Sequence, residues 1–353
     1  MLTWQGYNQT NMQPDKEITI YDLAKKLKIS PATVSRGLKD HPAISKKTKK
    51  KIFDLADEIG YRQNHFARNL RNQKTETIGV IVGKLNSNFQ SAVISGIEHI
   101  ANSYGYNLII SQSSEKSTKE AANAKTMFNS RVDGLLVSLA YDTEKLCHFD
   151  SFFKKNVPVI FFDRVMEHPN CTCILIDNAK AAYEATAHLL GQGCKRIVHL
   201  TATPKQNVYV DRLNGYKKAL EKHGVKFKEE MVIIGDLTME AGIEAAEKIM
   251  KMKPIPDGIF ASNDNAAVGC MIALKEKGVR IPDDIAVVGF NNDPVSRVVE
   301  PNLSTIEYNG YEVGVVAARH LINHLNGISP IHSTNTIILR SEFIMRASSL
   351  KKK

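Results

Sequence analysis

Residues 18–61 read ITIYDLAKKLKISPATVSRGLKDHPAISKKTKKKIFDLADEIGY, and this stretch decides the fold of the first part of the chain. It contains three short runs in which apolar residues recur at the spacing of one helix face, and each run has its own start signal. Thr19 followed by Asp22 is similar to a capping box, in which side chains satisfy the first free amides of a helix. The apolar face of this first predicted helix consists of Ile20, Leu23, Ala24 and Leu27.

The second and third predicted helices have equally clear ends. Ser30 is a good N-cap, and Pro31 stands at the first helical position, where its missing N–H costs nothing. The third helix starts near Ser45 and ends at Gly60, which readily takes the left-handed backbone that closes a helix. Two eight-residue helices joined by a short turn and braced by a third predict a helix-turn-helix, whose second helix enters the major groove of DNA. A three-helix unit that merely packs on itself is the alternative.

The positive charge of the chain is concentrated near its start. The formal net charge is +10, and residues 1–74 carry 15 Lys and Arg against 7 Asp and Glu. This local excess is typical of a nucleic-acid-binding module, although a solvated basic surface would have the same composition. We expect Arg36, on the second predicted helix, to contact a base or a phosphate. Contacts to phosphates that do not depend on DNA sequence would come from a lysine run: Lys46, Lys47, Lys49, Lys50 and Lys51.

Residues 18–61 resemble the DNA-binding headpiece of the lactose/galactose-repressor (LacI/GalR) family of transcription regulators almost position for position. The shared features are the Tyr-Asp-Leu-Ala opening at 21–24, the Ser-Pro-Ala-Thr-Val-Ser-Arg stretch at 30–36 and the final Gly-Tyr at 60–61. The resemblance then covers essentially the whole remaining chain, to about residue 347.

The resemblance implies how the chain would hold DNA. Residues 64–70 are similar to the family's hinge helix, and two such helices of a dimer pack side by side at the centre of the operator. Leu70 matches the apolar side chain that wedges into the minor groove and kinks the duplex. A helical linker with Leu70 packed on its own domain is the alternative, and Gln63 stands where the family commonly has proline. The implied segments are a disordered extension at 1–17, a helix-turn-helix domain at 18–62, and a hinge helix and linker at 63–75. The expected DNA contacts are Thr19, Tyr21, Pro31, Ala32, Thr33, Ser35, Arg36, Asn64, Ala67 and Leu70.

From Thr77 onward, short apolar runs alternate with amphipathic helical stretches. Alternation of strands and helices is typical of doubly wound parallel sheets, and two series of strands predict two such α/β lobes. Ligands bind such sheets at the carboxyl ends of strands, so we expect a ligand in the cleft between the lobes. The first series of strands is predicted at 77–82, 107–111, 134–138 and 158–162, and the second at 196–200, 231–234, 258–260 and 285–288.

This body resembles the periplasmic-binding-protein-like (type I) effector domain, whose chain crosses between its two lobes three times. The resemblance implies crossings near residues 176, 308 and 336. Late strands at 303–307 and 335–339 would flank a helix from about Tyr311 to Leu325. The implied ligand-binding and dimerisation domain is 76–347, with an N-lobe at about 76–175 and 309–335, a C-lobe at about 176–308 and 336–347, and a basic tail at 348–353.

Polar residues that follow predicted strands are the candidates for ligand contact. The resemblance implies that Asp163 accepts hydrogen bonds from ligand hydroxyls and that Arg212 clamps the ligand with its planar fork. The loop from Lys84 to Phe89 would supply an aromatic lid. For each polar residue taken alone, loop capping or packing between lobes is the alternative, above all for Asp264, which is well placed as a helix N-cap. The expected ligand contacts are Lys84, Phe89, Asp163, Arg164, Arg212, Asn263 and Asn291.

Two departures from the family pattern bear on the ligand. Asn291 stands where the family commonly has an aspartate, and Leu237 stands where an aromatic residue often stacks on the ligand. A neutral sugar and a sugar acid both stay open, because Arg164, Arg212 and Lys84 would all help to hold an acid.

Other classes of protein fit the sequence less well. The body has no G-x-G-x-x-G, Walker motif or nucleophile elbow, so we expect neither an enzyme nor a cofactor. The five cysteines are odd in number and lack the spacing of metal ligands, so we expect no disulfide framework and no metal. No apolar stretch approaches the roughly 18 residues of a membrane span and no signal peptide is recognisable, which predicts a cytoplasmic protein without membrane contact.

We therefore predict a bacterial transcription regulator, in the role of a repressor, that binds a palindromic operator as a homodimer. A small-molecule effector, a sugar or a sugar acid, would control it from the cleft between the lobes. The alternatives are a transport-type sugar-binding protein, which the body alone would fit, and an enzyme of small metabolites on a doubly wound scaffold.

Overall fold

The computed structural model describes residues 18–61 and 74–351 of the chain. The chain divides into two compact units, Met1–Thr75 and Glu76–Lys353, which we call the headpiece and the body. The predicted extension at 1–17 and most of the predicted hinge lie outside the described residues.

The headpiece consists of three helices, α1 (Ile20–Leu27), α2 (Pro31–Leu38) and α3 (Lys46–Glu58), as the sequence predicts. Their apolar faces meet in one small core of Leu23, Ala24, Val34, Ile52 and Ala56. The turn between α1 and α2 depends on Lys28, whose φ of 53° is left-handed and ends α1 abruptly. This arrangement is the predicted helix-turn-helix.

Side-chain caps fix where the headpiece helices begin. Both the backbone N–H and the hydroxyl of Thr19 donate to the Asp22 carboxylate, at 2.8 and 2.7 Å. Ser30 Oγ accepts the Thr33 N–H at 3.1 Å, and a serine in the same position caps α3. Each cap satisfies amides that the helix itself leaves free, so local chemistry sets the element boundaries.

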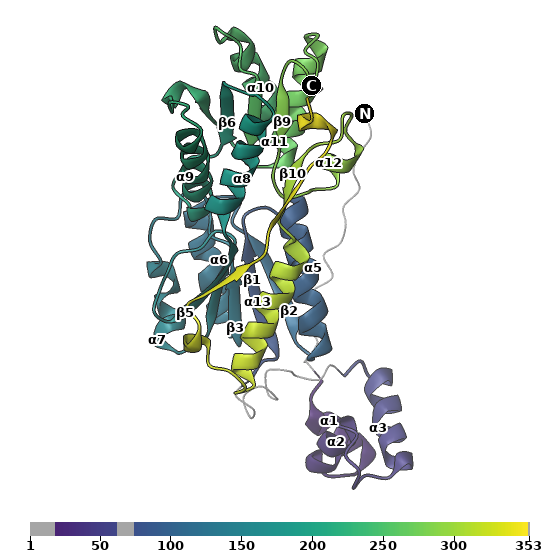
Figure 1. The fold of residues 1–353 in the computed structure, drawn as a ribbon. Helices are drawn as coiled ribbons and strands as arrows, with labels where there is room; N and C mark the ends of the chain where they lie inside the picture. Colours follow the sequence, from purple (N-terminus) through teal and green to yellow (C-terminus); the bar gives the residue numbers. More distant parts are fainter. Residues whose placement is uncertain (1–17, 62–73, 352–353) are drawn as a thin grey trace, which may run out of the picture. The chain divides into compact units, whose positions relative to one another are not determined.

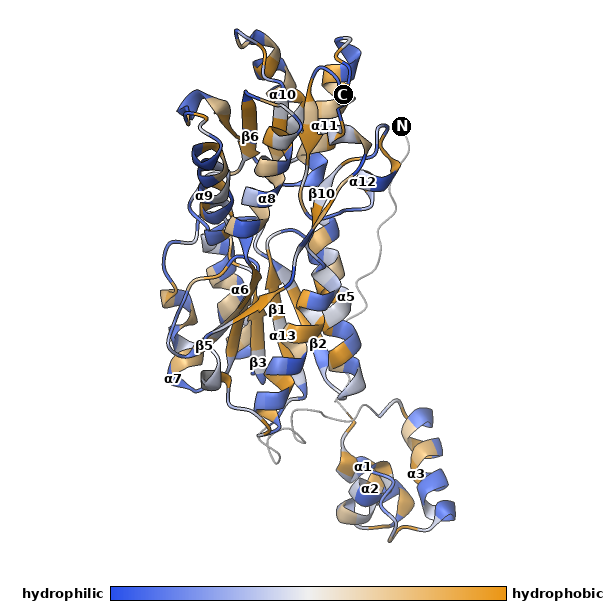
Figure 2. Cartoon of the chain, in the orientation of Figure 1, coloured by the Kyte–Doolittle hydropathy of each residue, from blue (hydrophilic) through white to orange (hydrophobic). Residues whose placement is uncertain are grey.

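The first lobe of the body is a parallel six-stranded sheet in the order β11-β5-β4-β3-β1-β2 (Figure 1). Alternate residues of each strand pack on opposite faces, so that Val80 and Val82 join one cluster and Ile81 joins another. Both faces are covered by helices, which is why β1, β3 and β4 read as continuous apolar runs, orange in Figure 2. The strands are β1 (Thr77–Val82), β2 (Asn107–Gln112), β3 (Gly134–Val137), β4 (Val159–Phe162), β5 (Cys171–Ile176) and β11 (Thr336–Leu339).

Two pairs of helices cover the faces of this sheet. On one face α5 (Asn88–Ser103) packs beside α13 (Gly310–Leu325), although more than 200 residues separate them in the chain. The other face carries α6 (Ser117–Asn129), a short turn at Cys147–Phe149 and α7 (Asp150–Lys154).

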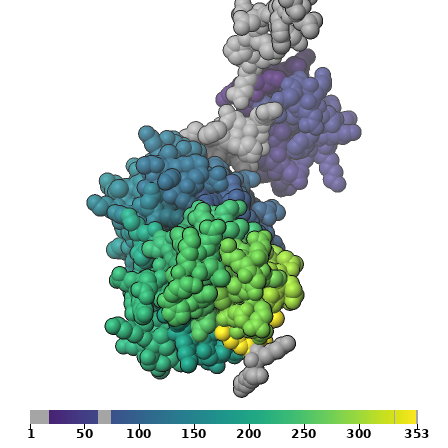
Figure 3. All heavy atoms as spheres, turned by 90° about the horizontal axis from the view of Figure 1, so that it is seen from above, coloured from purple at the N-terminus to yellow at the C-terminus, as the bar shows by residue number. Residues whose placement is uncertain are grey.

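The second lobe repeats this plan around a parallel four-stranded sheet, β7-β6-β8-β9, with α8 and α9 on one face and α10 and α11 on the other. Its outer surface forms most of the green face in Figure 3. The strands are β6 (Ile197–Thr201), β7 (Val232–Ile234), β8 (Gly258–Ala261) and β9 (Ala286–Val288), and the helices are α8 (Asn178–Gly191), α9 (Asn207–Lys222), α10 (Met239–Lys251), α11 (Asp264–Glu276) and α12 (Val295–Val298). The two doubly wound lobes confirm the predicted fold class.

Two strands of the body were absent from the sequence-based prediction. β5 pairs with β4 inside the first sheet, and β12 (Glu342–Ile344) pairs antiparallel with β10 (Thr305–Glu307). Each is short or interrupted by polar residues, so neither has the apolar run that marks the other strands.

The third crossing between the lobes was predicted one strand too early. Residues 336–339 form β11, which pairs in parallel with β5 at the edge of the first sheet, so they belong to the first lobe and the chain crosses after Leu339. The prediction that residues 348–353 form a basic tail also needs correction, because Ser348 and Ser349 are buried. Ser348 Oγ donates to the Val287 carbonyl at 2.6 Å, which ties the end of the chain to the second sheet.

Candidate functional site

A cavity of about 300 Å³ lies between the two lobes of the body. Residues that follow the carboxyl ends of strands in both lobes line it, as the doubly wound fold predicts. All seven residues expected to contact a ligand are among its lining: Lys84, Phe89, Asp163, Arg164, Arg212, Asn263 and Asn291. The larger part of the lining was not among the expected contacts, and in it Glu115, Tyr141 and Tyr209 bring ionisable or hydroxyl groups to the cavity.

Asp163 and Arg164 come directly after β4 and place opposite charges in the cavity. The Arg164 side chain is only 3% exposed and donates to Glu115 Oε2 at 2.7 Å. Its guanidinium carbon also lies 4.6 Å from the centre of the Tyr141 ring. The Asp163 carboxylate lies 3.5 Å from the Ser138 hydroxyl and also interacts with the Tyr308 hydroxyl. The carboxylate therefore has acceptor capacity left for a ligand.

Several contacts fix the Arg212 side chain in the lining of the cavity. Its Nε donates to Asn178 Oδ1 at 2.9 Å, and one terminal nitrogen donates to the Ser262 carbonyl at 2.7 Å. The guanidinium carbon lies 3.6 Å from the centre of the Phe290 ring, which fixes the plane of the fork. The Asp163 carboxylate interacts with this charge and favours the charged form of Arg212.

Four lining residues have left-handed backbones just after strands. The φ angles are 61° at Glu115, 61° at Asp163, 59° at Leu237 and 103° at Asn291. This conformation costs a non-glycine residue about 1 kcal/mol or more, and such residues cluster at functional sites. The turns redirect the chain where the strands end, and all four residues line the cavity.

Asn263 caps a helix, whereas the sequence favoured its neighbour for that role. Asn263 Oδ1 accepts the Ala266 N–H at 2.9 Å, and its amide nitrogen donates to the Leu237 carbonyl at 2.8 Å. Asp264 instead lies in the first turn of α11, fully buried, and accepts a hydrogen bond from the Thr305 hydroxyl at 2.7 Å. Asp264 therefore binds the crossing strand β10 and does not cap its own helix.

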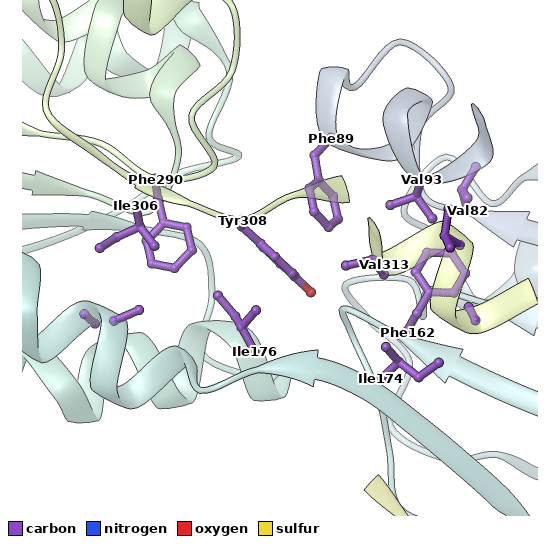
Figure 4. Packing of buried hydrophobic residues seen from close by; sticks show 14 of the residues in the cluster. Val82, Phe89, Val93, Phe162, Ile174, Ile176, Phe290, Ile306, Tyr308 and Val313 are labelled. Carbon is purple, nitrogen blue, oxygen red and sulfur yellow. The ribbon is translucent and has the colours of Figure 1, made fainter. Parts of the chain in front are cut away.

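Phe89, at the end of the loop expected to supply an aromatic lid, lines the cavity and packs against Tyr308. It stands in the first turn of α5, is 7% exposed, and its ring centre lies 4.4 Å from that of Tyr308. Figure 4 shows Tyr308 between Phe89 on one side and Phe290 on the other. Tyr308 follows β10 at a crossing, so this aromatic contact joins the lobes through packed side chains and leaves Phe89 little freedom.

Burial and paired charges shift the pKa values of the site. Burial raises the pKa of Asp163, although Arg164 and Arg212 oppose that shift. Burial lowers the pKa of Arg212. For Arg164 burial also acts downward, but the Glu115 carboxylate contributes to a larger opposing effect, and the pKa stands above its ordinary value. The cavity therefore contains two guanidinium and two carboxyl groups whose charges influence one another.

Hydrogen bonds across the cleft hold the lobes together at the start of α9. The buried Gln206 amide donates to the carbonyl oxygens of Ala140 at 3.0 Å and Thr143 at 2.8 Å. The next residue, Asn207, accepts the Val165 N–H at 2.9 Å. Since Gln206 and Asn207 belong to the second lobe and their partners to the first, the described body is in a closed arrangement.

The headpiece presents a candidate DNA-binding surface along α2. Arg36 and Ala32 are exposed there, and Tyr21 on α1 is 70% exposed. The other expected contacts at the starts and along the sides of α1 and α2 are exposed or partly exposed: Thr19, Pro31, Thr33 and Ser35. Lys49 departs from the expected phosphate contact, because its ammonium group binds Asp40 at 2.6 Å within the headpiece. The predicted contacts Asn64, Ala67 and Leu70, and Gln63 beside them, lie outside the described residues.

The same strand-end rule that identified Asp163 could have found Glu115, which follows β2 by three residues. Tyr209 precedes Arg212 by one turn of α9, so helical periodicity would have placed both on one face. No signal in the sequence marks Asn178 or Phe290 as partners of Arg212, because that contact depends on how the elements pack.

Residues 18–61 and 74–351 contain neither a candidate metal site nor a membrane-spanning helix. No group of three His, Cys, Asp or Glu side chains there could hold a metal ion. Within the same residues, every helix is too short or too polar to cross a membrane.

Comparison with known protein families matches nearly all of the described chain. Residues 75–345 match the family described as periplasmic binding proteins and sugar binding domain of the LacI family. Residues 19–64 match the bacterial regulatory proteins of the lacI family.

Individual relatives show the same likeness over almost their full length. Catabolite control protein A of Priestia megaterium is 33% identical over 310 residues, covering 88% of this chain and 93% of the relative. The probable HTH-type transcriptional repressor ExuR of Bacillus subtilis strain 168 is 30% identical, covering 94% and 98%. The crystal structure of the regulator CcpA of Lactococcus lactis matches with a TM-score of 0.71 at 27% identity, over 77% of this chain and 98% of that one. The Lac repressor dimer bound to operator and the anti-inducer ONPF has the same fold, with a TM-score of 0.82 at 23% identity, over 95% and 100%.

Proposed function

This chain belongs to the LacI family of bacterial regulatory proteins, and from that premise we propose that a sugar-like effector, bound between the two lobes of the body, controls its affinity for a palindromic operator. The chain is a DNA-binding transcription regulator with a sugar-binding domain, and its relatives are regulators rather than enzymes. We propose that it acts as a repressor in the cytoplasm, where the chromosome is accessible.

The cavity between the lobes is the observation that carries this proposal. Its volume of about 300 Å³ is at the lower end of the range for small-molecule sites. Its chemistry suits a compact polyhydroxylated ligand, because the Asp163 carboxylate can accept hydrogen bonds from hydroxyls while a fixed guanidinium fork at Arg212 can donate them. Phe89 and Tyr141 add apolar ring surface for the carbon face of a sugar ring. Lys84, Arg164, Asn263 and Asn291 complete the proposed ligand contacts.

The headpiece supplies the proposed DNA contacts. The small side chain of Ala32 lets the start of α2 approach the bases, and the exposed fork of Arg36 can bind a guanine edge or a phosphate. Thr19, Tyr21, Pro31, Thr33 and Ser35 flank it, and Asn64, Ala67 and Leu70 remain the proposed hinge contacts. A palindromic site needs two headpieces, so we propose a homodimer.

Control of DNA affinity by the ligand would follow from the contacts between the lobes. A ligand that binds both lobes stabilises the closed arrangement, in which Gln206 and Asn207 bridge the cleft. If closure changes the affinity for DNA, then operator DNA must change the affinity for the ligand by the same factor. This reciprocity distinguishes coupling from two independent binding activities.

Selection of binding sites from a random DNA pool by the full-length protein tests the proposal. We expect one palindromic consensus to emerge, and its dissociation constant to change at least about fivefold when a sugar that stabilises the body is added. Sugar binding without preference for any DNA sequence would instead favour the transport-type alternative. A strong operator preference that no sugar or sugar acid alters would refute the proposed control.

A further inference from the structure

Glu115 neutralises the most deeply buried cation of the cavity. The carboxylate is 11% exposed and lies 2.7 Å from Arg164, whose side chain is 3% exposed. Glu115 reaches this position from a loop after β2 in which two consecutive residues, Ser114 and Glu115, have left-handed φ angles of 51° and 61°. Two such residues in succession are unusual, so the loop is held in a costly conformation that delivers the carboxylate to Arg164.

Gly83 provides the space in which this pair meets. A Cβ atom at position 83 would collide with Glu115 Oε1 and with the Nη2 of Arg164. Gly83 has no left-handed backbone that would itself require glycine, so the close approach of the ion pair accounts for the missing side chain. The residue that follows β1 therefore leaves room for the ion pair.

The pair leaves one donor unused. The Nη2 atom of Arg164 is buried and has no hydrogen-bond partner among the residues that the structure describes, while Nη1 binds Glu115. The neighbouring Asp163 carboxylate likewise has acceptor capacity left. A ligand hydroxyl can donate to the Asp163 carboxylate, which keeps acceptor sites beyond those the protein uses. A ligand carboxylate offers only acceptors, and it would meet Asp163 and Glu115 as like charges.

We propose that Glu115 is a specificity-determining residue that occupies Arg164 with a protein carboxylate and thereby restricts the cavity to uncharged polyhydroxylated ligands. This inference rests on the proposed sugar-binding function and decides between the two ligand classes that the sequence leaves open. Without Glu115, the buried charge of Arg164 would favour a ligand that carries a carboxylate in its place.

Paired sugars that differ only in charge test the inference. The probes are glucose with glucuronate, galactose with galacturonate, and mannose with mannuronate, measured by thermal shift and then by calorimetric titration. The full-length protein should be stabilised by at least one neutral sugar and by none of the uronates. Glu115→Gln should raise the ratio of uronate to neutral-sugar affinity by at least about tenfold. A purely structural role would lower both affinities together and leave that ratio unchanged.

Glu244→Gln is the matched control, because it removes the same charge from an exposed position on α10 that does not line the cavity. Its ratio of affinities should stay within about twofold of the wild-type value. A second variant, Gly83→Ala, should displace the ion pair and move the ratio in the same direction as Glu115→Gln.

Three results would overturn the inference. A uronate that binds the unmodified protein more tightly than its neutral partner would show that Glu115 does not exclude acids, yet would leave a sugar-acid effector intact. An unchanged ratio of uronate to neutral-sugar affinity in Glu115→Gln would show that Glu115 does not determine ligand specificity. Failure of every probe to bind the unmodified protein or Glu115→Gln would refute both the inference and the proposed sugar effector. Operator selection tests DNA binding by the headpiece independently of that result.

Discussion

Replacement of Gln206 by alanine tests whether buried hydrogen bonds hold the lobes closed. The side chain is 2% exposed, and it donates to the carbonyl oxygens of Ala140 and Thr143 on the other lobe. Truncation removes these two bonds, together with a longer one to the Tyr141 carbonyl at 3.4 Å, and leaves the carbonyl groups without that donor. At about 1 kcal/mol for each of the two shorter bonds, the closed arrangement loses roughly 2 kcal/mol, or about a 30-fold shift of the population toward the open arrangement.

The amide of Val165 reports this opening without any ligand. Its N–H donates across the cleft to Asn207 Oδ1 at 2.9 Å, so separation of the lobes exposes it to solvent. Hydrogen exchange at Val165 should therefore accelerate by about 30-fold in Gln206→Ala when opening precedes exchange. Amides in the middle of β3, which bond within the first sheet, should keep their rates.

A neighbouring variant supplies the control. Lys205 also reaches the first lobe, where it binds Glu144 at 2.6 Å, but both side chains are at least half exposed. Solvent screens such a pair, so Lys205→Ala should change exchange at Val165 by less than about threefold. Equal effects of the two variants, or unaltered exchange in Gln206→Ala, would refute the argument that buried amide contacts keep the cleft closed.

Three other predictions concern the headpiece and the second lobe. Ser30→Ala removes the cap on the Thr33 N–H and should destabilise α2 by about 1 kcal/mol, which hydrogen exchange along that helix measures; unchanged protection would contradict the capping role. Arg36→Ala should weaken binding to the selected operator about tenfold or more in gel-shift titrations and weaken binding to random DNA less, whereas equal losses would indicate a phosphate contact. Burial raises the pKa of Asp293 from 3.8 to about 6, so the folded state binds the proton more tightly than the unfolded state and stability falls as the pH rises from about 4 to 6. Asp293→Asn should abolish that part of the slope and stabilise the body at pH 7 by up to about 3 kcal/mol in urea denaturation, and a slope identical to that of the unmodified protein would refute it.

The predictable part of the fold is the part that local chemistry controls. Ser30, Ser45 and Lys28 determine where the headpiece helices begin and end, and each acts within four residues of its partners. The main strands of the body were equally predictable from the sequence, because strands covered on both faces are apolar along most of their length. The seven residues expected at the ligand site line one cavity, since the carboxyl ends of parallel strands meet at the same edge of a sheet.

The errors in the prediction share one cause. Asp264 was expected as a helix cap but binds Thr305. β11 was assigned to the second lobe but pairs with β5. In each case the partner lies more than 40 residues away in the chain, and no local pattern encodes which distant element arrives there.

The amino-acid sequence by itself determined that this protein has a helix-turn-helix headpiece and two doubly wound lobes, because capping, periodicity and charge act over a few neighbouring residues. Only the tertiary structure decided that Glu115 meets Arg164 and that Gln206 bridges the cleft. Ion pairs and hydrogen bonds act over a few ångströms, and the distances between residues far apart in the chain exist only once it has folded.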